Sequence, residues 1–539
     1  MPRRLRSPSR WLLAIWLCFL GRGLFCCLAI PLWEGFDEYS HFSYVQHVDR
    51  GAWLIHSGAR ATREVEHSIE IVPMPWTLRG QPPPHETYES YWRLPPEVRR
   101  ARERELFALT PSAGDALSTL PSESQQPPLS YWLMAMLYNF VAGLSLPAQV
   151  LALRLLNLLL TSAAIPAAWM AARRVFPDAP TLATGIAALV ALFPEMMFDG
   201  ARVSNSALSI ALFSAFAVLG LDVLDARRHA AIWLGASLGL GLLTKGFFLG
   251  AVPVFVALLA WTLWKRTLKV RDAIASLALA AAIPGWWYVH NLRTTGSFST
   301  SIQEANLHGM PLFERLRHIR DVHWFAALDS TFFSHIWFGG WSFLQLRAWI
   351  YHVFALLAVL AIIGLAIAWR RRDPRRDHLA LLATIYALFC VGIAYHVLLT
   401  YLANGISSSA GWYLCSVIVP ETVLFVAGFR AYASRAINAL PAALAILDVY
   451  GLLFVALPYY TGLTAHKSNG FLEAFNLQRL TALRLAEIPR RLAANHSAGP
   501  VVIAVAGVLY LAATWFLVFA AITASSQTLP PQPKHSAAA

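Results

Sequence analysis

Two adjacent carboxylates, Asp37 and Glu38, follow directly after the first long apolar stretch of the chain. In a helix, residues four apart share a face, so Asp37 and His41 would lie together, with Tyr44 one turn further on. A carboxylate beside an imidazole at a membrane surface is a pair of groups that acid–base chemistry uses. Taken alone, however, a charge pair at a helix N-terminus is the simpler interpretation of Asp37 and Glu38.

The composition points to a membrane protein that crosses the bilayer many times. The 539 residues are 57% hydrophobic and 14% charged, and their mean hydropathy is +0.51. These values are too apolar for a soluble protein of this length. The net charge of +13 comes from Arg and Lys in short runs between apolar segments. This pattern is typical of cytoplasmic loops, so the sequence predicts membrane lipids as partners and no nucleic acid.

About 12 membrane spans are expected from the apolar segments, the first with its N-terminus in the cytoplasm. The predicted spans are 11–32, 148–172, 182–198, 207–224, 231–243, 247–264, 274–289, 349–369, 379–402, 412–429, 437–457 and 501–522. The cationic connectors are 173–174, 227–228, 265–271, 370–376 and 430–435. The five cysteines lie inside or beside apolar segments without metal-ligand spacing, so neither a disulfide framework nor a metal site is predicted.

The apolar segment 127–143 does not fit this series of spans. If every cationic connector is cytoplasmic, the number of crossings between the first span and Arg173 must be odd. Counting 127–143 as well as 148–172 makes that number two. We therefore expect 127–143 to be a helix in the membrane interface, where its Tyr131 and Trp132 fit well.

The predicted fold is an all-α polytopic membrane protein with a large first external loop that contains interfacial helices. Its predicted parts are 1–32 (cytoplasmic N-terminus and first transmembrane helix), 33–148 (first external loop with the catalytic motif), 149–290 (transmembrane helices), 291–348 (external loop), 349–458 (transmembrane helices), 459–498 (polar loop), 499–523 (last transmembrane helix) and 524–539 (disordered tail).

A family resemblance rests on several short motifs that occur in order. Phe36-Asp37-Glu38 followed by His41-Phe42 resembles the motif that opens the first external loop of protein O-mannosyltransferases and their relatives in the GT-C glycosyltransferase superfamily. The segment 241–246 is similar to a Gly-Leu-x-x-Leu-Thr-Lys turn of bacterial members, including the aminoarabinose transferases that act on lipid A. Further similar segments are 126–129, 152–155, 285–291 and 411–414. The resemblance implies a GT-C-like fold.

The sequence also departs from the family pattern. Ser206 stands where many bacterial members have an acidic residue, and Asp199 is the nearest substitute. Trp412 replaces an arginine of some relatives, and Gln126 replaces a histidine. These differences leave open an altered donor or a catalytically inactive homologue that acts in envelope assembly.

The resemblance implies an inverting glycosyltransferase in the plasma membrane, which in a bacterium is the inner membrane. It would move a sugar from a polyprenyl-phosphate donor to a lipid, glycan or protein acceptor at the external face. Catalytic roles are implied for Asp37 as base and for Glu38, which would hold sugar hydroxyls. The implied substrate-binding residues are His41, Lys245, Asn205, Arg293 and Gln126. For the lipid phosphate, Lys245 is the best placed cation, and Arg293 and Arg202 are weaker candidates. No cofactor is implied; a divalent metal on Asp37 and Glu38 is allowed but not indicated.

Two alternatives stay open at this stage. Lys245 could equally be a residue at the end of a short span whose side chain reaches the membrane surface. A transporter or flippase would place ionisable residues near the membrane midplane, and Asp448 and Glu421 are the residues that favour this.

Overall fold

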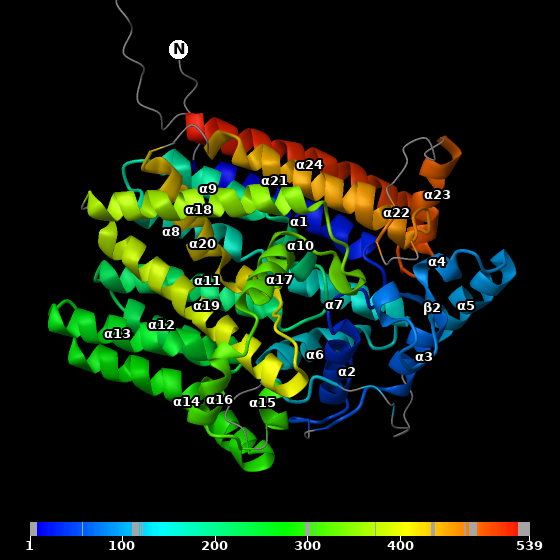
Figure 1. Ribbon diagram of the computed structural model, residues 1–539, viewed down its shortest axis with the longest axis horizontal. Helices are drawn as coiled ribbons and strands as arrows, with labels where there is room; N and C mark the ends of the chain where they lie inside the picture. Colours follow the sequence, from blue (N-terminus) through cyan, green and yellow to red (C-terminus); the bar gives the residue numbers. More distant parts are fainter. Residues whose placement is uncertain are drawn as a thin grey trace, which may run out of the picture.

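The computed structural model describes residues 8–55, 58–109, 118, 120, 122–296, 302–307, 309–371, 373–432, 437–467, 471–473 and 482–526. These residues form a helical protein (Figure 1). The sheet found among them is a parallel pair of two-residue strands, β1 (Pro73–Met74) and β2 (Glu86–Thr87). The predicted all-α polytopic architecture is confirmed.

Ten of the described helical segments are long and apolar enough to cross a membrane. They are Arg10–Ala29, Leu146–Val175, Ser206–Leu224, Gly246–Trp264, Val270–Thr295, Ala348–Arg370, Arg376–Asn404, Gly411–Arg430, Leu440–Tyr460 and Pro500–Ala524. They are built from α1 (Pro8–Ala29), α7 (Leu146–Thr161), α8 (Ala164–Val175), α11 (Ser206–Leu224), η2 (Gly246–Gly250), α13 (Ala251–Trp264), α14 (Val270–Thr295), α18 (Ala348–Arg370), α19 (Arg376–Asn404), η5 (Gly411–Val417), α20 (Ile418–Arg430), α21 (Leu440–Val449), η7 (Tyr450–Ala456), α22 (Leu457–Tyr460) and α24 (Pro500–Ser526).

Two of the 12 predicted spans differ from regular membrane helices. The span at 182–198 is a bent pair, α9 (Pro180–Leu192) and α10 (Pro194–Gly200), whose axes differ by 61°. Pro194 accounts for the break, because proline fits the first turn of a new helix but not a helix interior. The span at 231–243 is α12 (Ala230–Leu242), which has 13 residues. It is about 20 Å long, less than the hydrocarbon core of a bilayer.

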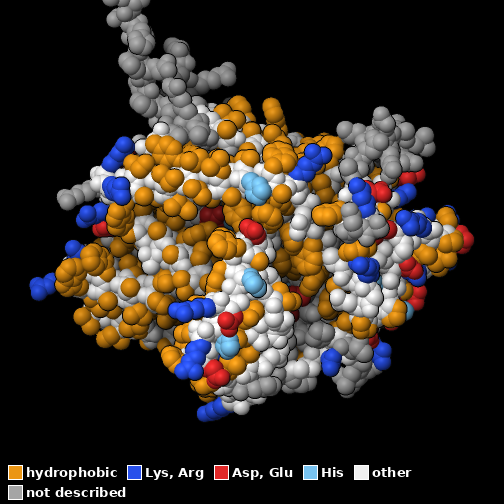
Figure 2. Space-filling view, viewed as in Figure 1, with side chains coloured by type: hydrophobic (Ala, Val, Ile, Leu, Met, Phe, Trp, Pro, Cys, Tyr) orange, Lys and Arg blue, Asp and Glu red, His pale blue; other side chains and the backbone are white. Residues whose placement is uncertain are grey.

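The described parts of three cationic connectors, after α11, α13 and α18, lie at one end of the helix bundle. Arg227 and Arg228 separate α11 from α12, and further cations separate α13 from α14 and α18 from α19. The last two connectors lie together at the left of Figure 1, and Figure 2 shows Lys and Arg side chains along that edge. Because consecutive helices reverse direction, the turns before α11 and after α12 lie at the opposite end. The cytoplasmic assignment of the cationic end stays a prediction.

The first loop forms a polar lobe beside the apolar bundle (Figure 2, right). Its elements are α2 (Glu38–Asp49), α3 (Arg63–Ile71), η1 (Trp76–Leu78), α4 (Tyr88–Tyr91), α5 (Pro96–Ala108) and α6 (Leu129–Val141). The 13-residue α6 packs on α2, where Tyr44 stacks on Tyr131 with ring centroids 3.7 Å apart. It is too short to cross a bilayer alone. Its predicted place in the membrane interface remains a prediction.

The remaining predicted parts are also largely helical where the structure describes them. The loop 291–348 contains α15 (Ile302–Asn306), α16 (Leu312–Arg317), η3 (His318–Arg320), α17 (Trp324–Ile336) and η4 (Gly340–Ser342), and the loop 459–498 contains α23 (Ala482–Ala493). The predicted disordered tail is wrong for its first three residues, because α24 runs to Ser526. Residues 527–539 and the N-terminal residues 1–7 lie outside the described residues.

Candidate functional site

The chain makes a sharp bend between α1 and α2 at the predicted motif. Trp33 and Asp37 both have left-handed backbone conformations, with φ of 65° and 55°. That region costs an ordinary residue about 1–2 kcal/mol, although aspartate tolerates it better than most. Asp37 stands at the N-cap of α2, yet its side chain makes no capping hydrogen bond. Its carboxylate is therefore available for another purpose, and strained residues of this kind cluster at functional sites.

Asp37 faces a cavity of about 390 Å³ that is built from turns at the bundle end opposite the cationic connectors. Five of the seven predicted site residues line it: Asp37, His41, Gln126, Asn205 and Lys245. Glu38 and Arg293 are not among its lining residues. The structure thus brings together segments that lie more than 200 positions apart in the sequence.

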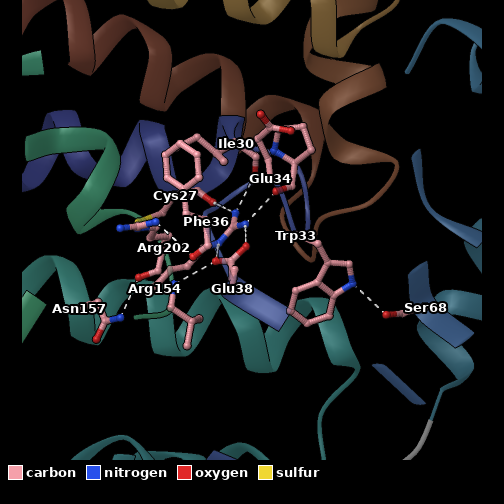
Figure 3. Close-up of polar contacts among 12 residues, drawn as sticks. Cys27, Ile30, Trp33, Glu34, Phe36, Glu38, Ser68, Arg154, Asn157 and Arg202 are labelled. Carbon is pink, nitrogen blue, oxygen red and sulfur yellow. Dashed lines mark hydrogen bonds and ion pairs between the residues drawn. The ribbon is translucent and has the colours of Figure 1, made fainter. Parts of the chain in front are cut away.

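Glu38 is completely buried and is bound on both carboxylate oxygens. Arg154 of α7 donates to it from Nε at 2.7 Å and from Nη2 at 2.6 Å, and the Val203 amide donates to Oε1 at 2.9 Å. Arg154 also donates to the carbonyls of Cys27, in the last turn of α1, and of Ile30 and Pro31, just after that helix (Figure 3). Glu38 therefore joins α1, α2 and α7 from outside the cavity.

Arg293 is exposed near the C-terminal end of α14. The sequence predicts a span that ends at residue 289 and places Arg293 in the external loop 291–348. The helix continues to Thr295 instead, and Arg293 stays on its exposed side.

Lys245 lies in the turn between α12 and η2 and points into the protein. Its side chain is 7% exposed, its Nζ donates to Ser206 Oγ at 2.8 Å, and it lies 5.0 Å from the centre of the Tyr413 ring. A side chain that reached the membrane surface would be more exposed. Burial lowers the pKa of Lys245 to about 8, against the opposing effect of nearby carboxylates.

Arg202 is the second cation on the cavity wall. It forms a buried ion pair with Asp199 and donates from Nη1 to the Phe36 carbonyl at 3.1 Å. Its buried Nε has no hydrogen-bond partner among the described residues. Asp199, the nearest substitute for the acidic residue absent at Ser206, is thus engaged by Arg202 and does not line the cavity.

His41 is held by an aromatic neighbour. Its Nδ1 lies 2.8 Å from the Tyr131 hydroxyl, and Tyr131 stacks on Tyr44. Burial, together with Arg202 and Lys245, lowers the pKa of His41 well below its usual value. The imidazole is therefore neutral at pH 7. It is positioned by Tyr131, while its link to Asp37 is a backbone hydrogen bond.

Sequence reasoning missed Glu123, a second carboxylate on the cavity wall. Its Oε2 accepts hydrogen bonds from Gln125 Nε2 at 2.8 Å and Gln126 Nε2 at 3.3 Å. Burial and, after it, the negative charge of Asp37 raise the pKa of Glu123 to about 8. No spacing rule marks this residue, but it lies three positions before Gln126, which begins one of the family-like motifs.

The cavity therefore combines two carboxylates with two cations. Burial raises the pKa of Asp37, while Arg202 and Lys245 oppose the rise. A buried carboxylate with a raised pKa is a stronger base, and two nearby cations can stabilise a negative charge that develops on a leaving group.

A metal ion would need different ligands from those the sequence suggested. Across the described ranges, no group of three or more His, Cys, Asp and Glu side chains could hold one. Asp37 and Glu38 cannot both serve as ligands while Arg154 engages Glu38.

Comparisons with known proteins agree with the resemblance seen in the sequence. Residues 125–288 match the family model of dolichyl-phosphate-mannose-protein mannosyltransferase, which confirms the resemblance over these residues. No curated protein sequence matches the chain.

Several solved structures match the chain in a structural comparison. ArnT from Cupriavidus metallidurans bound to undecaprenyl phosphate has a TM-score of 0.46 and 16% identity, covering 98% of this chain and 82% of that one. Its apo state has a TM-score of 0.39 and 17% identity, with 86% and 78% covered. An Archaeoglobus fulgidus oligosaccharyltransferase tethered to an acceptor peptide has a TM-score of 0.36 and 14% identity, with 96% and 55% covered.

Proposed function

We propose that the protein is a membrane glycosyltransferase. It transfers a sugar from a polyprenyl-phosphate donor to a hydroxyl of a lipid, glycan or protein acceptor at the external face of the membrane. The observation that carries this proposal is a single cavity in which Asp37, a carboxylate without a side-chain partner among the described residues, lies with Lys245 and Arg202. The family model that matches residues 125–288 is named for a transferase that uses a dolichyl-phosphate-linked sugar.

In the proposed mechanism, Asp37 removes the proton from the acceptor hydroxyl as that oxygen attacks the anomeric carbon. Lys245 contacts the phosphate that leaves, and the nearby charge of Arg202 adds to its effect, because buried charges act strongly on charge that develops in a transition state. The anomeric carbon acquires oxocarbenium character, as it does in glycoside hydrolysis. Attack from the face opposite the phosphate inverts the configuration.

The same cavity has an apolar side that suits the lipid part of the donor. Leu249 and Gly250 of η2 and Gly392 and Leu399 of α19 contribute this side. Both elements belong to helical segments that are long and apolar enough to cross a membrane. A polyprenyl chain held there would leave its phosphate at the polar end of the cavity.

Glu38 and His41 act as positioning residues in this proposal. Glu38 fixes the bend that aims Asp37 at the cavity, through its buried contacts with Arg154. His41 is held by Tyr131 on the same wall. Gln126 and Asn205 contact each other at 3.1 Å and offer amide groups to the substrate.

The residues that favoured a transporter have structural partners. Asp448 accepts a hydrogen bond from Arg22 at 2.6 Å, and Glu421 lies 2.9 Å from the ring of His335. None of them lines the cavity described above. They join helices to one another, which favours the transferase over a substrate path through the midplane.

The proposal is tested by Asp37→Asn in proteoliposomes supplied with polyprenyl-phosphate sugars and membrane extracts as acceptors. We expect transfer to fall about 10²–10⁴-fold, the usual effect of losing a general base. Binding of polyprenyl phosphate and the melting temperature should be retained. Asp49→Asn, at the other end of α2, is the matched control. Transfer at the wild-type rate by Asp37→Asn would contradict the mechanism.

A further inference from the structure

Four of the polar side chains on the cavity wall, apart from Asp37 and the two cations, are joined by hydrogen bonds. We call Glu123, Gln125, Gln126 and Asn205 the polar band; all four line the cavity. Gln125 and Gln126 donate to Glu123, and Asn205 donates to the side-chain oxygen of Gln126 at 3.1 Å. The band is therefore a connected set of carboxylate and amide groups.

The band has hydrogen-bonding capacity left over for a ligand. Both hydrogen bonds received by Glu123 fall on Oε2, and Oε1 has no partner among the described residues. Carboxylate and amide oxygens accept hydrogen bonds from hydroxyl groups, and amide nitrogens donate to them. A hydroxyl-rich ring can satisfy this set.

The charges around the band are unfavourable for an acidic ring. Asp37 contributes negative charge to the cavity, and Glu123, whose pKa is about 8, adds a second negative charge as the pH rises. The cations among the described lining residues are Arg202, which is paired with Asp199, and Lys245, which is needed by the donor phosphate. A third carboxylate would therefore lie near two like charges without a cation of its own.

We propose that the polar band together with Asp37 selects donors whose sugar carries no acidic group, and rejects uronic acids. This inference rests on the proposed transferase function and names the class of sugar. Glu123 is the specificity-determining residue, because it is the one carboxylate of the band. The rejection should strengthen as Glu123 loses its proton, and its pKa of about 8 places this change in an accessible range. The titratable and charged groups that surround it are Asp37, Tyr39, His41, Tyr131, Arg202, Lys245, His396 and Tyr413.

The test compares two donors that differ at one carbon: polyprenyl-phosphate-linked glucose and glucuronic acid on the same lipid. For the full chain in proteoliposomes, we expect kcat/KM to favour glucose, and the preference to grow at least about 10-fold between pH 7 and pH 9. Titration of Lys245 changes the phosphate contact of both donors alike, and any part of it that acts on the carboxylate of glucuronic acid remains in Glu123→Gln. In Glu123→Gln the preference should be smaller at pH 9 and should grow clearly less with pH than in the wild type.

A binding measurement keeps the inference testable even without turnover. Each lipid-linked sugar is used to displace a fluorescent polyprenyl phosphate, and the ratio of the two affinities replaces the ratio of kcat/KM. Glu97→Gln is the control, because Glu97 is an exposed residue of α5 in the same loop. Equal use or equal binding of the two sugars, or an unchanged pH dependence in Glu123→Gln, would overturn the inference. A preference for glucose in binding without any transfer would support it and contradict the proposed function alone.

Discussion

Asp37 and Glu38 are neighbours of the same chemical kind, but the structure gives them opposite environments. Asp37 faces the cavity, and its side chain neither caps α2 nor bonds to another described residue. Glu38 is completely buried and is bound by Arg154 through two hydrogen bonds (Figure 3). Asp37 has a left-handed backbone and precedes the helix, whereas Glu38 is the first residue of α2, so the chain sends one carboxylate to the cavity and the next to α7.

The difference shows how a buried ion pair can position a functional residue although the pair itself lies outside the cavity. The Glu38–Arg154 pair holds the end of α1, the start of α2 and the middle of α7 together. The left-handed conformation of Asp37 lies directly beside it. The orientation of the Asp37 side chain, the proposed base, therefore depends on the Glu38–Arg154 ion pair, which lies outside the cavity.

The largest expected effect is on the stability of the fold, and it distinguishes Glu38 from Asp37. Glu38→Gln leaves Arg154 as a buried, unpaired cation, which typically costs about 3–5 kcal/mol. We expect a large fall in the melting temperature and in the yield of purified protein. Asp37→Asn should melt like the wild type, because its carboxylate has no structural partner among the described residues.

A double variant completes this comparison. Glu38→Gln combined with Arg154→Leu removes both charges and should recover part of the lost stability. A Glu38→Gln protein that melts normally and fails to transfer sugar would show instead that Glu38 takes part in the chemistry.

Two buried cations also differ in their surroundings, and this difference predicts how the affinity for polyprenyl phosphate depends on pH. Arg154 is held by Glu38, whereas Lys245 lies in the cavity with a pKa lowered to about 8 by burial. Lys245 therefore carries its charge below pH 8 and loses it as the pH rises, about two units earlier than an exposed lysine. We expect the affinity for polyprenyl phosphate to fall about 10-fold between pH 7 and pH 9.5 in a fluorescence binding assay.

Lys245→Arg is the matched variant for this effect, because arginine stays charged over the whole range. Its affinity should change little between pH 7 and pH 9.5. An equally steep fall in Lys245→Arg would assign the pH dependence to another group.

Sequence patterns predicted the features that depend on residues close together in the chain, namely the apolar spans and the short motifs. Apolar segments gave the positions of the spans, and short motifs selected five residues that line one cavity. The partner of Glu38 could not be inferred, because Arg154 is 116 positions away and no local pattern joins them. Glu123 was missed because a lone glutamate before a proline-containing motif resembles any loop residue, and its value depends on the fold around Asp37.

Two helical glycines give a third contrast between residues in different environments. A Cβ at Gly364 would meet the Gly428 carbonyl oxygen at 2.0 Å, so this glycine allows α18 and α20 to pack closely. Gly392, within α19, lines the cavity, yet a Cβ there would meet nothing within 4 Å. A glycine inside a helix costs about 1 kcal/mol relative to alanine. Since packing does not require Gly392, the space beside it suits a ligand, which in the proposed function is the polyprenyl chain.

The smallest expected effect comes from filling this space with Gly392→Leu. The helix should become slightly more stable, so a loss of activity cannot be attributed to unfolding. We expect transfer from a long polyprenyl-phosphate sugar to fall several-fold, and transfer from a donor with two or three isoprene units to change less. Gly285→Leu is the control, because Gly285 is also helical and open but does not line the cavity. If both donors lose activity equally, Gly392 faces the sugar or the acceptor, and the polyprenyl chain must leave the cavity along another wall.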